Sequence, residues 1–323
     1  MVLNKDGGLM LKKLGIDKTE LCIILLTLTL ITFPFIGAPK SVLLYLFLFF
    51  VYMTLSMAWN LVAGYAGLVS LCPPAFFGLA GYSLAIFTLL KFSVCVAIGV
   101  GILVAILFAL IISIPIFRLM GIYFSISTLV IPEALRIAFF LWRPIKGTFH
   151  GGGAGYMIPV TEKLKMETIY LFSLFVAAFS IYILKKIKNS KFGFGLAAIR
   201  DNQRTATSCG INVYKLKLQS FIISAILIAL AGSVFYIYQG FIEPSSAFNI
   251  KWTMIAMLST VIGGMGTLFG PVMGSAFVTF LHFLLARYGN LSLLIQGVIL
   301  VAIMLLLPRG IMGFLLGKSN KVY

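Results

Sequence analysis

The chain has 323 residues, of which 61% are hydrophobic and only 10% are charged, and its formal net charge is +17. So few charged side chains cannot cover a water-soluble protein of this length, and lipid must be the solvent for most of the chain. The basic residues stand almost entirely between apolar runs, which indicates membrane topology rather than nucleic-acid binding. The four cysteines form no Cys-x-x-Cys pair and the two histidines stand far apart, so the sequence predicts neither a metal site nor a bound cofactor.

Apolar runs of about 20 residues, the length that crosses a bilayer as a helix, follow one another along the chain. Residues 1–20 are polar and basic, and we expect them to form a cytoplasmic N-terminal segment. No small-residue cleavage site follows the first apolar run, so we expect that run to be retained. The predicted spans are 21–38, 41–59, 64–90, 92–116, 119–142, 168–184, 218–238 and 291–307. Together they predict one transmembrane domain over residues 21–310.

The stretch from Gly64 to Gly81 differs from an ordinary span, because glycines and a Pro-Pro pair interrupt it. A broken helix leaves backbone groups unpaired, and in hydrocarbon such a break survives only inside protein or beside a water-filled cavity. We therefore predict a translocation path lined by Gly64, Tyr65, Gly67, Ser70, Pro73, Pro74 and Phe76. The alternative is that the glycines only let helices pack closely.

Two ionisable residues, Glu133 and Arg136, lie within the span 119–142. Their spacing of three residues places them on one helix face, where they can neutralise each other. We predict an intramembrane charge pair, which can be purely structural. A proton-coupled carrier would be expected to bury more such groups.

Residues 185–217 form a polar segment with eight Lys or Arg and one acid. Because basic residues gather on the cytoplasmic side, we expect this loop in the cytoplasm and the loop 143–167 outside. Between Leu196 and Cys209 apolar residues recur near a helical period, which predicts one short amphipathic helix that docks a cytoplasmic partner. The alternative is a helix lying on anionic headgroups. The residues assigned to docking are Gly195, Leu196, Ile199, Arg200, Asp201, Arg204 and Gly210, the last with positive φ after the helix.

The region 252–285 is interrupted by Gly263, Gly264, Gly266, Gly270, Pro271 and Gly274, and can be one long span or two short helices. Two helices give ten spans with both termini inside, and place sixteen Lys and Arg in the cytoplasm against eight outside. One span gives fourteen against ten, so the hairpin fits better. Residues 311–323 then form a cytoplasmic tail. Paired interruptions often mark a transport pathway, so Gly263, Gly264 and Gly266 join the predicted path.

Several motifs, in chain order, are similar to those of one family. Gly64-Tyr-Ala-Gly67, Ser70-Leu71, Ala75-Phe-Phe-Gly78 and Tyr82 resemble the signature of the LIV-type permease subunits of ABC importers for branched-chain amino acids. Leu196-Ala-Ala-Ile-Arg-Asp-Asn202 and Gly210-Ile-Asn-Val213 resemble the coupling loop of that family. The segment 262–274 and Pro308-Arg-Gly310 continue the match, so the resemblance covers roughly residues 40–315.

The resemblance implies an all-helical polytopic membrane permease in the inner (plasma) membrane of a prokaryote. It also implies a second related permease subunit, two cytoplasmic ATP-binding subunits and an external substrate-binding protein, with the predicted loop helix docking on the ATPase. The chain has no Walker A motif, so we expect ATP hydrolysis on a separate chain and no enzymatic activity in this one. The expected substrate is a small amino acid, most of all a branched-chain one. Relatives of the same build move urea and short amides, and an ion-coupled secondary carrier is the alternative from another class.

Overall fold

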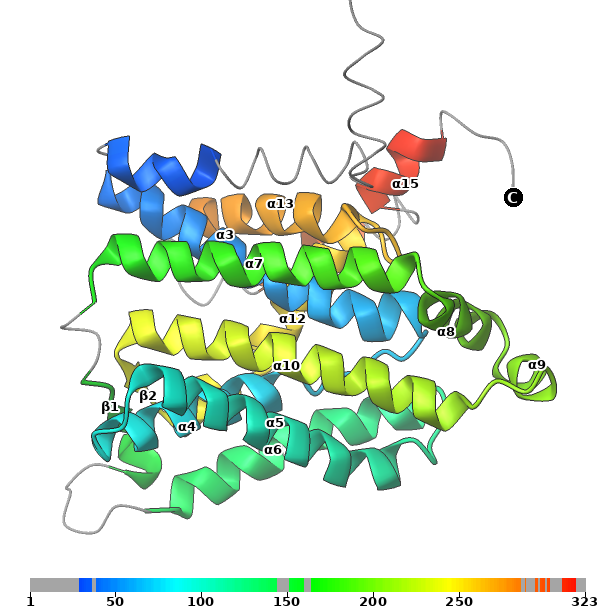
Figure 1. The fold of residues 1–323 in the computed structure, drawn as a ribbon, viewed down its shortest axis with the longest axis horizontal. Coiled ribbons are helices and arrows are strands. Elements are labelled where there is room, and N and C mark those ends of the chain that lie inside the picture. Colours follow the sequence, from blue (N-terminus) through cyan, green and yellow to red (C-terminus); the bar gives the residue numbers. More distant parts are fainter. Residues whose placement is uncertain are drawn as a thin grey trace, which may run out of the picture.

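The computed structural model describes residues 29–36, 39–143, 151–159, 164–285, 288, 294–295, 297–299, 301–302 and 310–317. Helices dominate these residues, and the long ones run side by side along one direction (Figure 1). The chain therefore has the helical, membrane-type architecture that its composition predicts.

Five helices in the described part are long and apolar enough to cross a membrane. The predicted spans that they confirm are 41–59, 92–116, 119–142, 168–184 and 218–238. The expected spans 21–38 and 291–307 lie largely outside the described residues. The five helices are α3 (Lys40–Asn60), which continues into the π-helical turn η2 (Leu61–Tyr65), α5 (Val94–Ile116), α6 (Ile122–Leu141), α7 (Met166–Lys188) and α10 (Val213–Gln239).

The region 252–285 forms two helices, α12 (Lys251–Gly263) and α13 (Gly270–Leu285). At about 1.5 Å rise per residue, α12 is shorter than the hydrocarbon core of a bilayer, which is about 30 Å thick. The two helices pack against each other as a hairpin. A Cβ at Gly274 would lie 1.7 Å from the carbonyl oxygen of Ser259, so this glycine allows the close approach. The region therefore forms two helices, as the hairpin interpretation predicts, and not one continuous helix.

Short elements gather at the two ends of the helix array (Figure 1). At one end, β1 (Tyr156–Met157) and β2 (Phe241–Ile242) pair antiparallel, beside the 3-10 turn η3 (Gly152–Ala154) and α11 (Pro244–Ala247). At the opposite end, α8 (Lys191–Asp201) and α9 (Gln203–Ser208) connect α7 to α10. The remaining described helices are α4 (Pro73–Leu89) and α15 (Gly310–Gly317), and α15 packs against the hairpin.

The core centres on α10, which packs against α3, α4, α5 and α7. A Cβ at Gly232 would lie 2.6 Å from the carbonyl oxygen of Phe77, so the glycine lets α10 approach α4. Phe77 in turn stacks on Trp252 of α12, with ring centroids 4.1 Å apart. Large aromatic side chains thus fill the space between α4, α10 and the hairpin.

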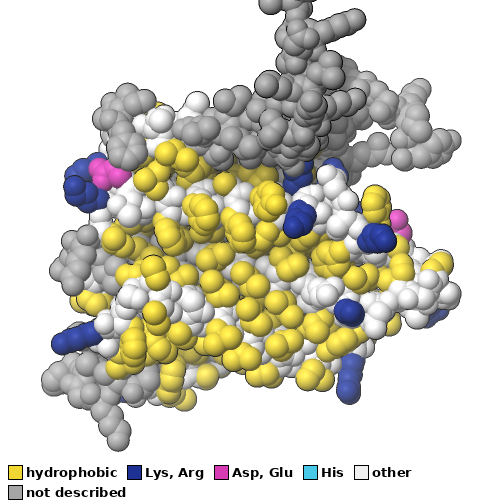
Figure 2. All heavy atoms as spheres, in the orientation of Figure 1, with side chains coloured by type: hydrophobic (Ala, Val, Ile, Leu, Met, Phe, Trp, Pro, Cys, Tyr) yellow, Lys and Arg dark blue, Asp and Glu magenta, His cyan; other side chains and the backbone are white. Residues whose placement is uncertain are grey.

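The outer surface has the pattern of a membrane protein. Figure 2 shows hydrophobic side chains across the middle of the displayed face and Lys and Arg side chains toward its two ends. Helices α5 and α6 contribute exposed apolar residues, since only 33% and 17% of the residues in their most apolar segments are buried within the chain. Lipid or a partner subunit must therefore cover these helices.

Candidate functional site

The predicted interruption between α3 and α4 is present, but the prolines do not cause it. Helix α3 passes into the π turn η2, residues 66–72 are not helical, and α4 begins at Pro73. Pro73 and Pro74 occupy the first turn of α4, where the backbone N–H groups that proline lacks would have no hydrogen-bond partner within the helix. The break therefore lies before the prolines, and Gly67 within it has a φ of +72°. We call residues 66–72 the α3–α4 break.

Side chains from three helices hold the α3–α4 break. Backbone groups in a break need such partners, because lipid offers none. The break is thus an ordered element whose backbone groups are held by protein side chains. Trp59 Nε1 donates to Ser70 O (2.8 Å), Ser125 Oγ to Val69 O (2.8 Å) and Thr253 Oγ1 to Leu71 O (3.3 Å), and Leu71 N donates to Thr128 Oγ1 (2.9 Å).

The end of α3 and the turn between α12 and α13 are joined by Asn60, whose side chain is fully buried. Its Nδ2 donates to the carbonyl oxygen of Thr267 (2.9 Å), and its Oδ1 accepts from the N–H of Gly266 (2.8 Å). Arg200 of α8 reaches the same place, where its Nη1 donates to the carbonyl oxygen of Gly64 (3.0 Å). We call Asn60, Gly64, Arg200, Gly266 and Thr267 the glycine junction.

The glycines of the junction leave no room for side chains. A Cβ at Gly64 would lie 2.0 Å from Asn60 Oδ1 and 2.6 Å from the nitrogen of Gly266. Beside the junction, Gly310 approaches Gly264, two residues before Gly266, so closely that a Cβ at Gly310 would lie 2.6 Å from the Cα of Gly264. Three glycine motifs far apart in the sequence therefore converge at one place. The sequence pointed to each of these glycine motifs separately. It did not point us to Asn60, although a single amide side chain inside an apolar helix is itself a sign of a buried polar contact.

The polar loop folds differently from the expectation. One helix over Leu196–Cys209 is wrong, because Asn202 ends α8 and caps α9, with its Oδ1 accepting from the N–H groups of Arg204 (3.0 Å) and Thr205 (3.2 Å). Asn competes with the helix backbone for hydrogen bonds, and therefore favours such a restart. Gly210 has a φ of +80°, as predicted.

The apolar side of α8 faces its own chain. Leu196 and Ile199 are buried, and α8 packs against α7, α10 and η2. The expectation that these two side chains stand free for a partner is therefore wrong. Gly195 also lies inward, since a Cβ there would be 2.7 Å from Leu216 Cδ1.

The exposed side of the loop carries different residues. Phe194 is 71% exposed, a large apolar side chain that the sequence reasoning did not single out. Asp201 pairs with Arg200, whose Nε lies 3.3 Å from Asp201 Oδ1. Arg200 thus contacts both the glycine junction and the outer surface of the loop.

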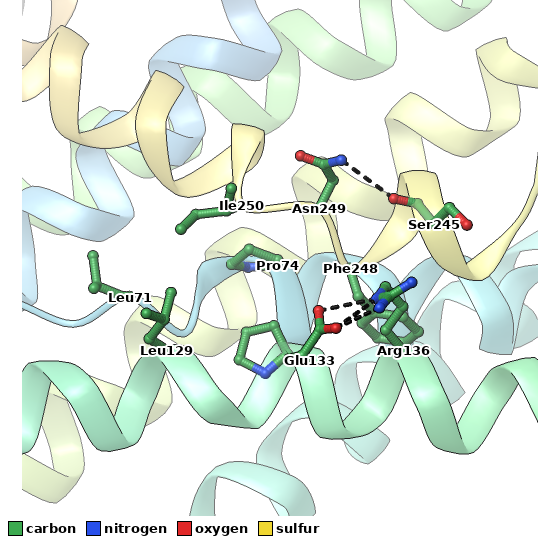
Figure 3. Close-up of a pocket in the computed structure, with 10 residues that line it drawn as sticks. Leu71, Pro74, Leu129, Glu133, Arg136, Ser245, Phe248, Asn249 and Ile250 are labelled. Carbon is green, nitrogen blue, oxygen red and sulfur yellow. Dashed lines mark hydrogen bonds and ion pairs between the residues drawn. The ribbon is translucent and has the colours of Figure 1, made fainter. Parts of the chain in front are cut away.

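A cavity of about 420 Å³ lies between α4, α6 and the segment that leads from α11 into α12 (Figure 3). Leu71 and Pro74 bring the α3–α4 break and the start of α4 to its wall. Figure 3 shows Leu71, Leu129 and Ile250 grouped at one side and Glu133, Arg136, Asn249 and Ser245 at the other. The cavity therefore has an apolar end and a polar end; Pro132 and Phe248 complete its lining.

The charge pair predicted on α6 is present at this cavity. Arg136 Nε donates to both carboxylate oxygens of Glu133, at 3.0 and 2.9 Å, and Nη2 also donates to Oε1. The side chains of Glu133 and Arg136 are 55% and 38% exposed within the chain. Charged groups at membrane depth face a bundle interior or a water-filled space. The pair therefore marks the side of α6 that faces the cavity, not lipid.

Long apolar helices, an apolar outer surface and two helix breaks held by side-chain hydrogen bonds define a multi-pass membrane protein. Residues 41–307 match the profile of the family described as branched-chain amino acid transport system / permease component. The chain belongs to this family of ABC transport permease subunits, and the resemblance drawn from its motifs is confirmed. A permease subunit of this kind is not itself a catalyst.

Named relatives agree with the family. The chain is 24% identical to the high-affinity branched-chain amino acid transport system permease protein LivM of Escherichia coli, over 91% of this chain and 75% of that protein. It is 24% identical to the probable branched-chain amino acid transport permease protein LivM of Methanocaldococcus jannaschii, over 66% and 69%. It is 25% identical to LivH of Escherichia coli over 46% and 47%. No solved structure matches the chain.

Proposed function

We propose that this permease imports small amino acids, with branched-chain amino acids as the main substrates. ATP hydrolysis on partner subunits drives this import. The observation that carries the proposal is the hydrogen bond from Arg200 of the polar loop to Gly64 beside the α3–α4 break. A cytoplasmic loop that holds the end of an interrupted membrane helix can pass movement from an ATPase to that helix. The names of the relatives supply the substrate class.

We place the translocation path along the α3–α4 break and the turn of the α12–α13 hairpin. Its proposed residues are those expected from the sequence: Gly64, Tyr65, Gly67, Ser70, Pro73, Pro74, Phe76, Gly263, Gly264 and Gly266. Tyr65 and Phe76 are buried, and Phe76 packs edge-on against Phe108 and Phe221. The path is thus closed where Gly64 meets Gly266, and transport requires these two segments to separate.

The proposed topology has ten spans, with both termini and the polar loop in the cytoplasm. Residues 1–20, 21–310 and 311–323 remain the proposed cytoplasmic segment, transmembrane domain and tail. The ends of the helix array support this orientation, since the α8–α9 end carries the eight basic residues of the polar loop. The membrane is the inner membrane of a prokaryote.

The proposed assembly contains a second related permease, two cytoplasmic ATP-binding subunits and an external substrate-binding protein. The ATPase docks on the exposed side of α8 and α9, where Phe194 offers an apolar contact and Asp201 and Arg204 lie at its edge. Leu196 and Ile199 support α8 from within. This arrangement replaces the amphipathic face that the sequence assigned to docking.

Uptake by cells tests the substrate class. A strain that lacks the gene for this chain is complemented with it, and uptake of labelled leucine, isoleucine and valine is compared with that of urea and acetamide. We expect complementation to restore uptake of the three amino acids only. Restoration of urea or acetamide uptake alone would assign the permease to another substrate.

A further inference from the structure

We propose that the cavity between α4, α6 and the α11–α12 segment binds the free amino acid during transport. In this site Glu133 receives the substrate ammonium group and Arg136 its carboxylate, while Leu71, Leu129 and Ile250 contact its apolar side chain. The inference rests on the proposed function and deepens it, because it names the part of the substrate that each end of the cavity recognises. It assigns Glu133 and Arg136 a role beyond that of a structural pair.

The polar end has the donors and acceptors that a zwitterion requires. The hydrogen bonds to Glu133 use Nε and Nη2 of Arg136, and within the described residues Nη1 makes no hydrogen bond. A carboxylate can therefore bind Arg136 without displacing Glu133. The oxygens of Glu133 offer more acceptor positions than three hydrogen bonds fill. Ser245 and Asn249, which also line this end, come from a separate segment of the chain.

The apolar end fits the other half of the same substrate. Leu71 comes from the α3–α4 break, Leu129 from α6 and Ile250 from the start of α12, so three elements form one apolar wall. The cavity volume of about 420 Å³ lies within the range of small-molecule sites, about 300–1,000 Å³. An amphipathic ligand is therefore matched at both ends. Urea, which has no charged groups and no apolar part, would use neither.

The position of the cavity connects it to the place where the proposed path is closed, between Gly64 and Gly266. Leu71 and Pro74 line the cavity, and the chain runs from them through the α3–α4 break to Gly64 at the glycine junction. Thr253 of α12 also donates to the carbonyl oxygen of Leu71 (3.3 Å). A substrate that contacts Leu71 therefore touches the α3–α4 break, which leads directly to the π turn where Arg200 binds Gly64.

Equilibrium binding to the purified transporter complex in nanodiscs tests the polar end. Labelled leucine is the probe, and its competitors are leucinamide, which lacks the carboxylate, and 4-methylpentanoate, which lacks the ammonium group. We expect saturable leucine binding, and about tenfold or weaker competition by both analogues, because each loses a charged hydrogen-bonded contact. Arg136→Gln should weaken leucine binding to the leucinamide level and leave leucinamide unchanged. Glu133→Gln should weaken leucine binding to the 4-methylpentanoate level and leave the binding of 4-methylpentanoate unchanged.

A charge exchange separates recognition from a structural role. The double variant Glu133→Arg with Arg136→Glu keeps an ion pair on α6 but reverses the two charges relative to the apolar end. We expect it to bind leucine about tenfold or more weakly, as after loss of the charged contacts. Parent-like leucine binding by the exchanged variant would overturn the proposal. So would an Arg136→Gln variant that loses leucine and leucinamide equally, or a parent complex without saturable leucine binding.

The apolar end is tested by selectivity. Leu129→Phe should shorten the apolar end and lower the ratio of leucine to alanine binding by about tenfold, the scale on which a pocket discriminates small apolar groups. Val130→Phe is the matched control, because Val130 is exposed on α6 and does not line the cavity. Equal ratios in the two variants would overturn the assignment. A complex that binds leucine but fails these tests would refute only this proposal. A complex that transports urea and not leucine would also refute the proposed substrate class.

Discussion

The Nη1 atom of Arg200 donates a hydrogen bond to the carbonyl oxygen of Gly64, 3.0 Å away and 136 residues distant in the sequence. The contact joins α8 of the polar loop to the π turn that ends α3. Gly64 lies in the last turn before the helix ends, where backbone carbonyls have no partner within the helix, so Gly64 can accept a hydrogen bond from outside it. Arg200 therefore links the proposed docking surface directly to the proposed path.

Arg200→Gln should uncouple ATP hydrolysis from uptake. The variant removes a hydrogen bond between a charged donor and a carbonyl, a contact that contributes about 1.5–3 kcal/mol. We expect the complex to assemble and hydrolyse ATP, while leucine uptake per ATP falls by about an order of magnitude. Uptake and phosphate release measured on the same proteoliposomes give this ratio. Arg204→Gln is the control, because among the residues that the structure describes no hydrogen bond joins Arg204 to the glycine junction. An unchanged ratio in Arg200→Gln would contradict the link.

Gly64→Ala should open or distort the glycine junction. Its Cβ would lie 2.0 Å from Asn60 Oδ1 and 2.6 Å from the backbone nitrogen of Gly266, so one of these groups must move. Overpacking of this kind costs about 1–3 kcal/mol. We expect a lower melting temperature in detergent and loss of uptake. Gly99→Ala on α5 is the matched control, since a Cβ there meets nothing within 4 Å, and equal behaviour of the two variants would argue against a tight junction.

Phe194→Ser should weaken ATPase binding without unfolding the permease. Burying a large apolar side chain in an interface stabilises it by about 1.5–3 kcal/mol. We expect about tenfold less ATPase to copurify with the variant, at an unchanged melting temperature of the permease. Phe194→Leu, which keeps an apolar side chain, should retain most of the ATPase. If the Phe194→Ser variant copurified with as much ATPase as the parent, α8 would instead be a helix that lies on the lipid surface.

Ile199→Asp should act through stability instead. Ile199 is buried against its own chain, and an unpaired carboxylate there costs several kcal/mol. We expect poor recovery of folded permease on size-exclusion chromatography before any loss of ATPase binding is visible. A well-folded Ile199→Asp permease that merely lost its ATPase would return this residue to the docking surface.

Cysteine labelling in intact cells tests the orientation of the polar loop. The native Cys209 is exposed at the α8–α9 end, and Met157 is exposed on β1 at the opposite end. Each position is tested as the only cysteine, in a background without the other native cysteines. We expect an impermeant maleimide to label the Met157→Cys variant and not Cys209. Labelling of Cys209 from outside would reverse the proposed topology.

The sequence was sufficient for features that depend on local physics. Hydrophobic length alone located α3, α5, α6, α7 and α10, because a span must satisfy its backbone within itself. The glycines marked the interruption between α12 and α13, and the distribution of Lys and Arg favoured two helices over one. The spacing of Glu133 and Arg136 predicted their ion pair.

Features that depend on tertiary contacts were missed or misjudged. Periodicity gave α8 an apolar face but could not show that Leu196 and Ile199 face their own chain. The prolines were read as the cause of a break that lies before them, because Pro at the start of a helix and Pro inside one look alike in an apolar run. Asn249 and Ile250 were not assigned to the site, since only the fold brings their segment to α6.

ATP-driven leucine uptake is the measurement that tests the central claim most directly. The complex of this permease with its copurified partners is reconstituted in proteoliposomes, with the substrate-binding protein outside the permease and ATP supplied to the ATPase side. We predict leucine accumulation that requires ATP and persists when ionophores abolish the proton and sodium gradients. Accumulation that needs an ion gradient and ignores ATP would contradict the account and identify a secondary carrier.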